Sequence, residues 1–428
     1  METIAASLLI AIPGFVILMG LEFLVVKYKG GRSYDNIPDV ISSLSSGIAN
    51  VMKGSLGLVL VLVPYEWMVE NVAIFSIDPN SVATWIIAIL CLDFAAYWYH
   101  RWTHKYNFLW QLHLIHHAGE QFNVSTALRQ PVNNVVNIVT IGWFPAAIAG
   151  IPPEMMVTIG LVHLYYQYWY HTELVGDLGF LEKIIMTPRL HAVHHAMNRE
   201  YVDKNFSAWF CIWDRLFGTY QQPLESAPIV YGITIPAKTW NPVKIDFMHW
   251  GTIVKDMVAT KSWKDKFRLI YKPTNWRPAD VRKSHKIPRV RDVYSYEPYA
   301  PKISTGLLVW SHIEIMLTGA MMMLFFYLFP TYSIAEIYGF SLFTIFSVMA
   351  YTTLMEGKYA LSWLVTRLLL AVGILWFYGG NWFGFNEYVS FIGVALLAYY
   401  SFSIVASWIL ISGDYDDEIS LSTSQATG

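Results

Sequence analysis

Apolar stretches recur along the chain at a length that suits a lipid bilayer. A helix needs about 20 apolar residues to cross the hydrocarbon core, because each residue adds about 1.5 Å. Only helices or closed barrels satisfy their backbone groups in lipid, so the sequence predicts an all-α integral membrane protein. We expect about nine transmembrane or membrane-embedded helices, near residues 6–26, 45–65, 82–100, 132–150, 154–171, 304–329, 334–355, 360–379 and 388–411.

The composition agrees with a membrane setting. The 428 residues are 55% hydrophobic and only 14% charged, whereas soluble domains are about 25% charged. The 18 Trp and 27 Tyr suit a protein with two membrane interfaces, where amphipathic rings collect. We expect no nucleic-acid partner, because the formal net charge is −2 and the chain carries no basic arm or recognition motif.

The basic residues predict which side of the membrane each loop occupies. The first apolar stretch lacks a basic leader and precedes Lys27, Lys29 and Arg32, so we expect a retained anchor that ends in the cytoplasm. The outer loops should then be 66–81, 150–153, 330–333 and 380–387, and none of these contains Lys or Arg. The protein is therefore expected in a bacterial inner membrane or the endoplasmic reticulum.

Hydropathy and charge divide the chain into parts. The polar stretch 172–303 predicts a cytoplasmic helical cap, and its second half, 238–302, holds fifteen Lys and Arg residues. A surface facing lipid headgroups is favoured for this half over a docking site for an acidic partner. The expected parts are N-terminal transmembrane helices (1–80), a histidine-rich core (81–225), a basic cytoplasmic segment (226–303), C-terminal transmembrane helices (304–412) and a disordered tail (413–428).

Three histidine clusters on the cytoplasmic side predict a site for two metal ions. Residues at i, i+3 and i+4 share a helix face, whereas adjacent residues diverge by about 100°. One histidine of each adjacent pair can therefore face a different metal. This many imidazoles exceed the three or so ligands of a catalytic zinc. The predicted ligands are His100 and His104, then His113, His116 and His117, then His191, His194 and His195, with His171 between the last two clusters.

The ligand type leaves the metal open, because imidazole suits iron, copper, nickel and zinc. Two irons are favoured, since a pair beside a membrane can activate O2 for attack on an unactivated C–H bond. No HExxH zinc-protease motif is present. His171 could instead be an interfacial residue, and His163 is expected to be buried and hydrogen-bonded rather than a ligand.

Metal-bound histidines usually donate their second N–H to a carboxylate or a carbonyl. The favoured acceptor is Asp93, which lies inside an apolar stretch two turns before His100. A second buried charge, Arg367, is expected to pair with Glu356 or with a backbone carbonyl. The other candidate carboxylates for the histidines are Glu120, Glu173, Asp203 and Asp214.

These motifs resemble the fatty acid hydroxylase/sterol desaturase superfamily of membrane di-iron oxygenases. Within it, the resemblance to the alkylglycerol monooxygenase family is close and covers most of the chain. Its most specific part is the run Ser125–Gln130, which follows the second histidine cluster. The other similar stretches are Asp93–Arg101, Trp110–His117, Tyr168–Glu173, Thr187–His195, Asp203–Asn205 and Trp213–Thr219.

The resemblance implies an O2-dependent monooxygenase that hydroxylates the ether-adjacent carbon of an alkylglycerol lipid. It implies two iron ions held by the eight clustered histidines, and tetrahydrobiopterin as electron donor. One departure stands at Lys105, where animal members have Glu, so an altered environment beside the metals or a different reductant is also expected.

Two other functions stay open. The first is a hydroxylase or desaturase of fatty-acyl, sterol or carotenoid substrates that receives electrons from a redox protein. The second, a metal transporter or sensor, is disfavoured because the histidines gather at one face instead of along the spans.

Overall fold

The computed structural model describes residues 2–57, 60–61, 63–75, 77–134, 136–137, 139–357 and 360–426. Within these ranges the backbone is helical apart from loops and one minimal strand pair. Strands β1 (Leu60–Val61) and β2 (Val136–Asn137) run parallel, with Leu60 opposite Val136. The predicted all-helical class is confirmed.

Six helices in the described ranges are long and apolar enough to cross a bilayer, and they coincide with six of the nine predicted stretches. An integral membrane protein is therefore confirmed. The six are α1 (Glu2–Tyr28), α4 (Val82–Lys105), α15 (Thr305–Leu328), α16 (Ile334–Leu354), α17 (Ala360–Phe377) and α18 (Ile392–Ala426).

The other three stretches differ from the prediction. The helix expected at 45–65 is α2 (Ile37–Ser55), which starts earlier and buries a serine-rich face inside the protein. The stretch 132–150 is broken into α7 (Val139–Gly142) and α8 (Phe144–Ile148), because Pro145 starts a new helix. The last is α9 (Pro153–Tyr166), whose 14 residues reach only about 21 Å.

A tight turn joins α8 to α9. Gly150 has φ +75°, and a Cβ there would collide with the carbonyl oxygen of Phe75. Only glycine therefore fits this turn. The two helices are 5 and 14 residues long, so the hairpin does not form the two full spans that the sequence predicts.

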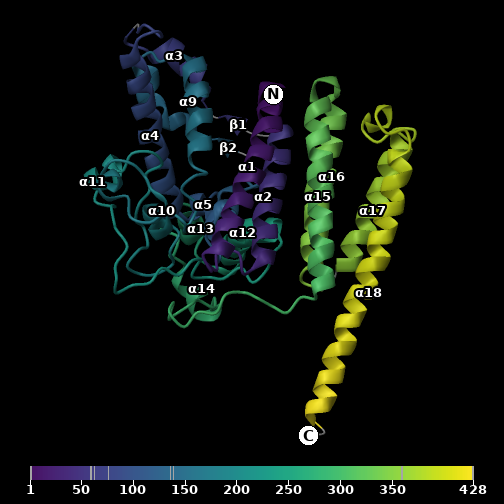
Figure 1. The fold of residues 1–428 in the computed structure, drawn as a ribbon. Helices are drawn as coiled ribbons and strands as arrows, with labels where there is room; N and C mark the ends of the chain where they lie inside the picture. Colours follow the sequence, from purple (N-terminus) through teal and green to yellow (C-terminus); the bar gives the residue numbers. More distant parts are fainter. Residues whose placement is uncertain are drawn as a thin grey trace.

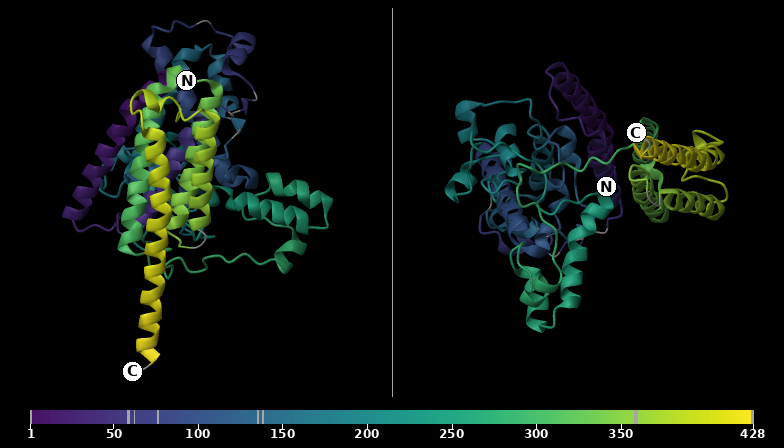
Figure 2. Two further views of the ribbon diagram at one scale, coloured as in Figure 1. Left: turned by 90° about the vertical axis from the view of Figure 1, so that its right-hand side faces the viewer. Right: turned by 90° about the horizontal axis from the view of Figure 1, so that it is seen from below.

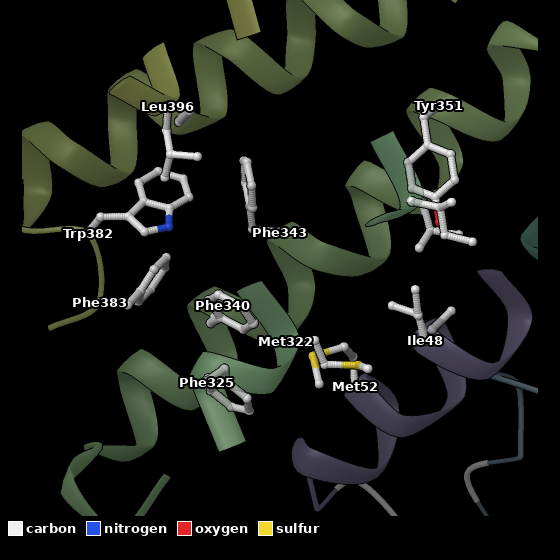
Figure 3. Close-up of a cluster of buried hydrophobic side chains, with 14 of the residues drawn as sticks. Ile48, Met52, Met322, Phe325, Phe340, Phe343, Tyr351, Trp382, Phe383 and Leu396 are labelled. Atoms are coloured by element: carbon white, nitrogen blue, oxygen red, sulfur yellow. The ribbon is translucent and has the colours of Figure 1, made fainter. Parts of the chain in front are cut away.

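The helices form two groups with α1 and α2 between them. Figure 1 shows α3 (Tyr65–Val72), α4 and α9 on one side, and α15 to α18 on the other. Helix α2 packs against α16 through a shared apolar core, drawn in Figure 3. The residues of this core labelled in Figure 3 are Ile48 and Met52 of α2 together with Met322, Phe325, Phe340, Phe343, Tyr351, Trp382, Phe383 and Leu396.

The short helices gather at one end of the spans, where α4 also ends (Figure 1). The predicted outer turns, including the one next to α3, lie at the opposite end. The short elements at this end are α5 (Asn107–Trp110), α6 (Leu114–His117), η1 (Val124–Leu128), η2 (Gly179–Lys183), α10 (Pro188–His194), α11 (Ile212–Leu216), α12 (Pro242–Ala259), α13 (Trp263–Tyr271) and α14 (Ala279–Ser284). Two further short elements, η3 (Phe329–Thr331) and η4 (Phe385–Glu387), belong to the outer turns at the opposite end.

The cytoplasmic orientation, the five-part division and the disorder of the tail stay predictions. The backbone of α18 continues as a helix through Ala426, while residues 427–428 lie outside the described ranges.

The prediction for Arg367 is wrong in its partner. Its guanidinium donates to both carboxylate oxygens of Glu314, at 2.7 and 2.9 Å. Glu356 instead accepts from Lys244 at 3.1 Å. The correct partner lies 53 residues away on α15, a neighbour that only the packing of the C-terminal helices creates, since α15 and α17 both contact α16 and α18.

Candidate metal centre

All nine imidazoles that the sequence predicts as ligands lie together, in two adjoining groups. Within each group, one ligand atom per residue lies within 4.8 Å of the others. The other four histidines, His163, His249, His285 and His312, belong to neither group. The first group is His100, His104, His113, His117 and His194; the second is His116, His171, His191 and His195.

Several elements supply the histidines, and two of these elements contribute to both groups. The last turns of the membrane span α4 carry His100 and His104, so the first group begins where a bilayer helix ends. The short helices α6 and α10 each contribute to both groups. The chain just after α9 adds His171 to the second group.

The Nε2 atoms converge inside each group. The Nε2 atoms of His100 and His113 lie 2.9 Å apart, and that of His191 is 2.9 Å from the Nε2 of His171 and 3.0 Å from that of His195. Three further Nε2 atoms are buried without a hydrogen-bond partner, those of His104, His117 and His194.

This donor set fits metal ions. A buried polar atom without a partner costs about 1–3 kcal/mol, and a cation that accepts the imidazole lone pairs removes that cost. Uncharged imidazole is also the form that binds a metal. Burial lowers the pKa of His171 to about 3 and lowers the pKa of His113, His116, His117, His191, His194 and His195 well below its usual value.

Backbone carbonyls hold the second nitrogen of four imidazoles. The Nδ1 atoms of His100 and His194 lie 2.8 Å from the carbonyl oxygens of Phe206 and Lys204. Those of His116 and His171 lie 3.3 and 2.8 Å from the carbonyl oxygens of Arg129 and Gln167. These contacts place the N–H on Nδ1 and leave the Nε2 lone pair free for a metal.

The prediction that Asp93 accepts from a clustered histidine is wrong. Its carboxylate accepts the backbone N–H groups of Trp209 and Phe210 at 2.9 and 3.1 Å, and the indole N–H of Trp213 at 2.9 Å. His163 completes the set, with its Nε2 at 3.3 Å. His163 is thus buried and hydrogen-bonded, as predicted.

The other candidate carboxylates also bind groups outside the two histidine groups. Glu120 accepts from Tyr296 and Tyr299, and Glu173 accepts from Ser33 and Tyr231. None of the contacts described for Asp203 joins it to a clustered histidine.

Asp214 and Asp93 hold the same loop from two ends. Asp214 accepts the backbone N–H groups of Phe206 and Ser207 at 2.8 and 2.9 Å, while Asp93 accepts those of residues 209 and 210. Both carboxylates are fully buried. Because this loop supplies the carbonyl that His100 uses, the two aspartates position an imidazole through the backbone.

The run Ser125–Gln130 connects helix α2 to the second histidine group through Arg129. Arg129 is 1% exposed, and its guanidinium donates to the Asp39 carboxylate at 2.5 Å and to Ser43 at 2.9 Å. Its own carbonyl faces His116. Sequence reasoning singles out this run by resemblance alone, and the structure supplies the physical reason for it.

Lys105 does not reach the histidines through any described contact. It is the last residue of α4, its side chain is exposed, and its Nζ lies 5.9 Å from the centroid of the Tyr106 ring. The expected change beside the metals therefore has no support in the contacts of this side chain.

Comparisons with known proteins agree with this architecture. Residues 85–219, which contain all nine histidines, match the fatty acid hydroxylase family. The chain is 35% identical over 310 residues to alkylglycerol monooxygenase of Homo sapiens, which covers 72% of this chain and 68% of that protein. The chain belongs to the alkylglycerol monooxygenase family.

Other members of the alkylglycerol monooxygenase family give similar matches. The enzyme of Danio rerio is 35% identical over 272 residues, covering 64% of this chain and 60% of that protein. The enzyme of Xenopus tropicalis is 32% identical over 305 residues, covering 71% and 67%. No solved structure matches this chain. Family membership makes the protein an oxygen-dependent lipid monooxygenase of the membrane.

Proposed function

We propose that the two histidine groups hold two iron ions and that the protein hydroxylates the ether-adjacent carbon of alkylglycerols, with tetrahydrobiopterin as reductant. The observation that carries the proposal is the convergence of nine imidazoles into groups of five and four. Imidazole ligands suit iron. The names of the relatives that cover most of the chain supply the substrate class.

Bound iron would supply the activation of O2 and the insertion of one oxygen atom into the substrate C–H bond. The second oxygen atom leaves as water, with two electrons from the reductant and two protons. The product is a hemiacetal, which separates into an aldehyde and a glycerol derivative.

The depth of the site suits an ether lipid. His100 and His104 project from the end of a membrane span, so the histidine groups lie near the bilayer boundary. In an alkylglycerol, the ether-linked carbon joins the polar glycerol to the apolar chain. A lipid that keeps its glycerol among the headgroups therefore brings this carbon to the depth of the histidines.

Aromatic side chains pack against the histidine groups. The Phe206 ring centroid lies 5.2 Å from that of His104 and 5.7 Å from that of His194. On the second group, Phe122 lies 5.2 Å from His195. A dry site strengthens electrostatic interactions and protects reactive species from side reactions.

We further propose that the site faces the cytoplasm. The support is the absence of Lys and Arg from the four predicted outer loops, together with the basic residues of 183–302. A cytoplasmic site would receive a soluble reductant directly.

The first test is the iron content of detergent-purified protein, with Mössbauer spectra of iron-57 material. We expect about two coupled irons per chain, and loss of turnover in His113→Ala and His194→Ala with membrane insertion intact. One zinc per chain would contradict the two-iron proposal, and full activity in either variant would contradict the ligand role of the histidine that it lacks.

A second candidate is hydroxylation or desaturation of fatty-acyl, sterol or carotenoid lipids with a redox-protein donor. Two relatives favour it: ornithine lipid hydroxylase OlsE of Rhizobium tropici, 28% identical over 150 residues, and fatty acid hydroxylase vlmA of Lecanicillium, 26% identical over 167. Turnover of alkylglycerols in membranes supplied with tetrahydrobiopterin alone would favour the first candidate; dependence on a redox protein would favour the second.

A further inference from the structure

Helix α13 leaves one apolar face uncovered. Trp263, Phe267 and Ile270 are four and three residues apart, so their side chains share a stripe, and they are 74%, 65% and 41% exposed. Leu269 points to a different side of the helix and is only 1% exposed. The helix therefore packs through one face and presents a second, apolar face outward.

Lysines border this stripe. Lys261, just before the helix, and Lys264 are exposed beside it, and the Nζ of Lys266 lies 5.4 Å from the centroid of the Trp263 ring. The surrounding segment 238–302 has fifteen Lys and Arg against six Asp and Glu. An apolar face with aromatic residues and lysine flanks is typical of helices that lie in the lipid interface.

The neighbouring helix α12 shows a second stripe of this kind. Phe247, Val254 and Val258 are seven and four residues apart and are 48%, 52% and 78% exposed. Figure 2 shows α12 and α13 as an arm that projects sideways from the spans. An arm with this direction can lie along a membrane surface that the spans cross.

The carboxyl end of α13 is fixed next to the end of a membrane span. Helix α4 ends at Lys105, and the backbone N–H of Asn107 donates to the carbonyl of Lys272 at 2.8 Å. The side-chain amide of Asn107 donates to the carbonyl of Leu269 at 2.8 Å. Because the end of a span marks the edge of the apolar layer, α13 lies at headgroup depth.

We propose that the arm formed by α12 and α13 rests in the interfacial layer of the bilayer. Its apolar stripes lie against the upper acyl chains, and its lysines contact acidic phospholipid headgroups. The arm also packs against α6, because Ile245 of α12 shares a buried apolar cluster with Leu114 and Ile115 of this helix. Contact with lipid thus bears on the element that carries His116 and His117.

The test measures how deep the arm lies in full-length protein in lipid nanodiscs. A Cys91→Ala background leaves only Cys211, a free and buried thiol. A nitroxide is attached in turn to Phe267→Cys, to Val258→Cys and to the control Lys286→Cys, which is exposed beyond α14. Its accessibility to O2, which enters bilayers, is compared with its accessibility to a nickel chelate, which stays in water.

With acidic phospholipid present, we expect the O2-to-nickel accessibility ratio at positions 258 and 267 to be several-fold higher than at 286. Neutral phosphatidylcholine discs and the Lys261→Glu/Lys264→Glu variant should both reduce this difference. Equal ratios at all three positions would overturn the proposal and leave the stripes to solvent or to another protein. If the difference in accessibility ratio is the same in neutral discs and in the lysine variant, the role of acidic headgroups is overturned.

Discussion

His116 and His117 are neighbours in the chain, but their imidazoles belong to different histidine groups. Their ring planes are 88° apart, with centroids separated by 5.6 Å. His194 and His195 repeat this relationship, at 90° and 5.5 Å. Each adjacent pair on one short helix therefore serves both groups at once, which ties the positions of the two groups together.

This arrangement predicts unequal effects of two neighbouring substitutions. His117→Ala leaves four imidazoles in the first group, whereas His116→Ala leaves three in the second. We expect His116→Ala to lose more iron per chain than His117→Ala, because the group that His116 belongs to keeps one ligand fewer. Iron per chain, measured by mass spectrometry after desalting, checks this. Equal losses would show that the two groups do not bind independently.

The loop held by Asp93 and Asp214 gives a second prediction. An amide in place of either carboxylate has one acceptor oxygen for several backbone N–H groups. We therefore expect Asp214→Asn to weaken metal affinity about 10–100-fold through the carbonyl that faces His100. The rate at which the purified protein loses metal to an added chelator measures this change in affinity.

The matched control is Asp78→Asn. This aspartate is exposed before α4, and its carboxylate accepts the backbone and side-chain N–H groups of Asn80 at 2.9 and 3.2 Å. Chelation as slow in Asp214→Asn as in this control would contradict the positioning role.

Sequence reasoning identified the histidines but not the groups that orient them. The nine imidazoles could be predicted because histidine is rare and its spacing on a helix is regular. The imidazoles of His100 and His194 donate to the backbone carbonyls of Phe206 and Lys204. Every residue has such a carbonyl, so the sequence gives no sign of which ones serve as acceptors. Asp93 lies on the same helix as His100, but its carboxylate faces a loop more than 100 residues later, which helical spacing does not show.

The predicted helix bounds were right for the long spans and wrong for the stretch 132–150, which is broken into α7 and α8. Stretches such as 334–355 carry enough apolar residues to decide their own structure. In the region after residue 132, Pro145 and Gly150 interrupt a stretch of similar hydropathy. Local breakers therefore outweigh average composition there.

Asp246 predicts how stability changes with pH. Burial raises its pKa to about 7, so between about pH 4 and pH 7 the folded protein holds a proton that the unfolded chain has released. Folding stability therefore falls as pH rises through this interval. We expect the Tm in detergent to decrease from about pH 5 to about pH 8 more steeply in wild type than in Asp246→Asn.

Asp246→Asn is a mild change, because the amide oxygen can still accept from the backbone N–H groups of Val132 and Asn133, now at 3.0 and 2.8 Å from Oδ2. Parallel Tm profiles of the two proteins would rule out ionisation of this carboxyl as the cause.

The ion pair between Glu314 and Arg367 predicts the behaviour of the C-terminal helices. Both side chains are only 1% exposed, and the hydroxyl of Ser403 donates to Glu314 at 2.5 Å. Removing one charge leaves the other buried and unpaired, which costs about 3–5 kcal/mol. We expect Glu314→Gln to lower the Tm in nanodiscs, while the double variant Glu314→Leu/Arg367→Met restores most of it, because an apolar pair removes both charges.

Iron content should stay the same in both variants, since none of the nine histidines comes from α15 or α17. A double variant as unstable as Glu314→Gln would contradict this account, because it would show that the ion pair contributes net stability that two apolar side chains do not replace.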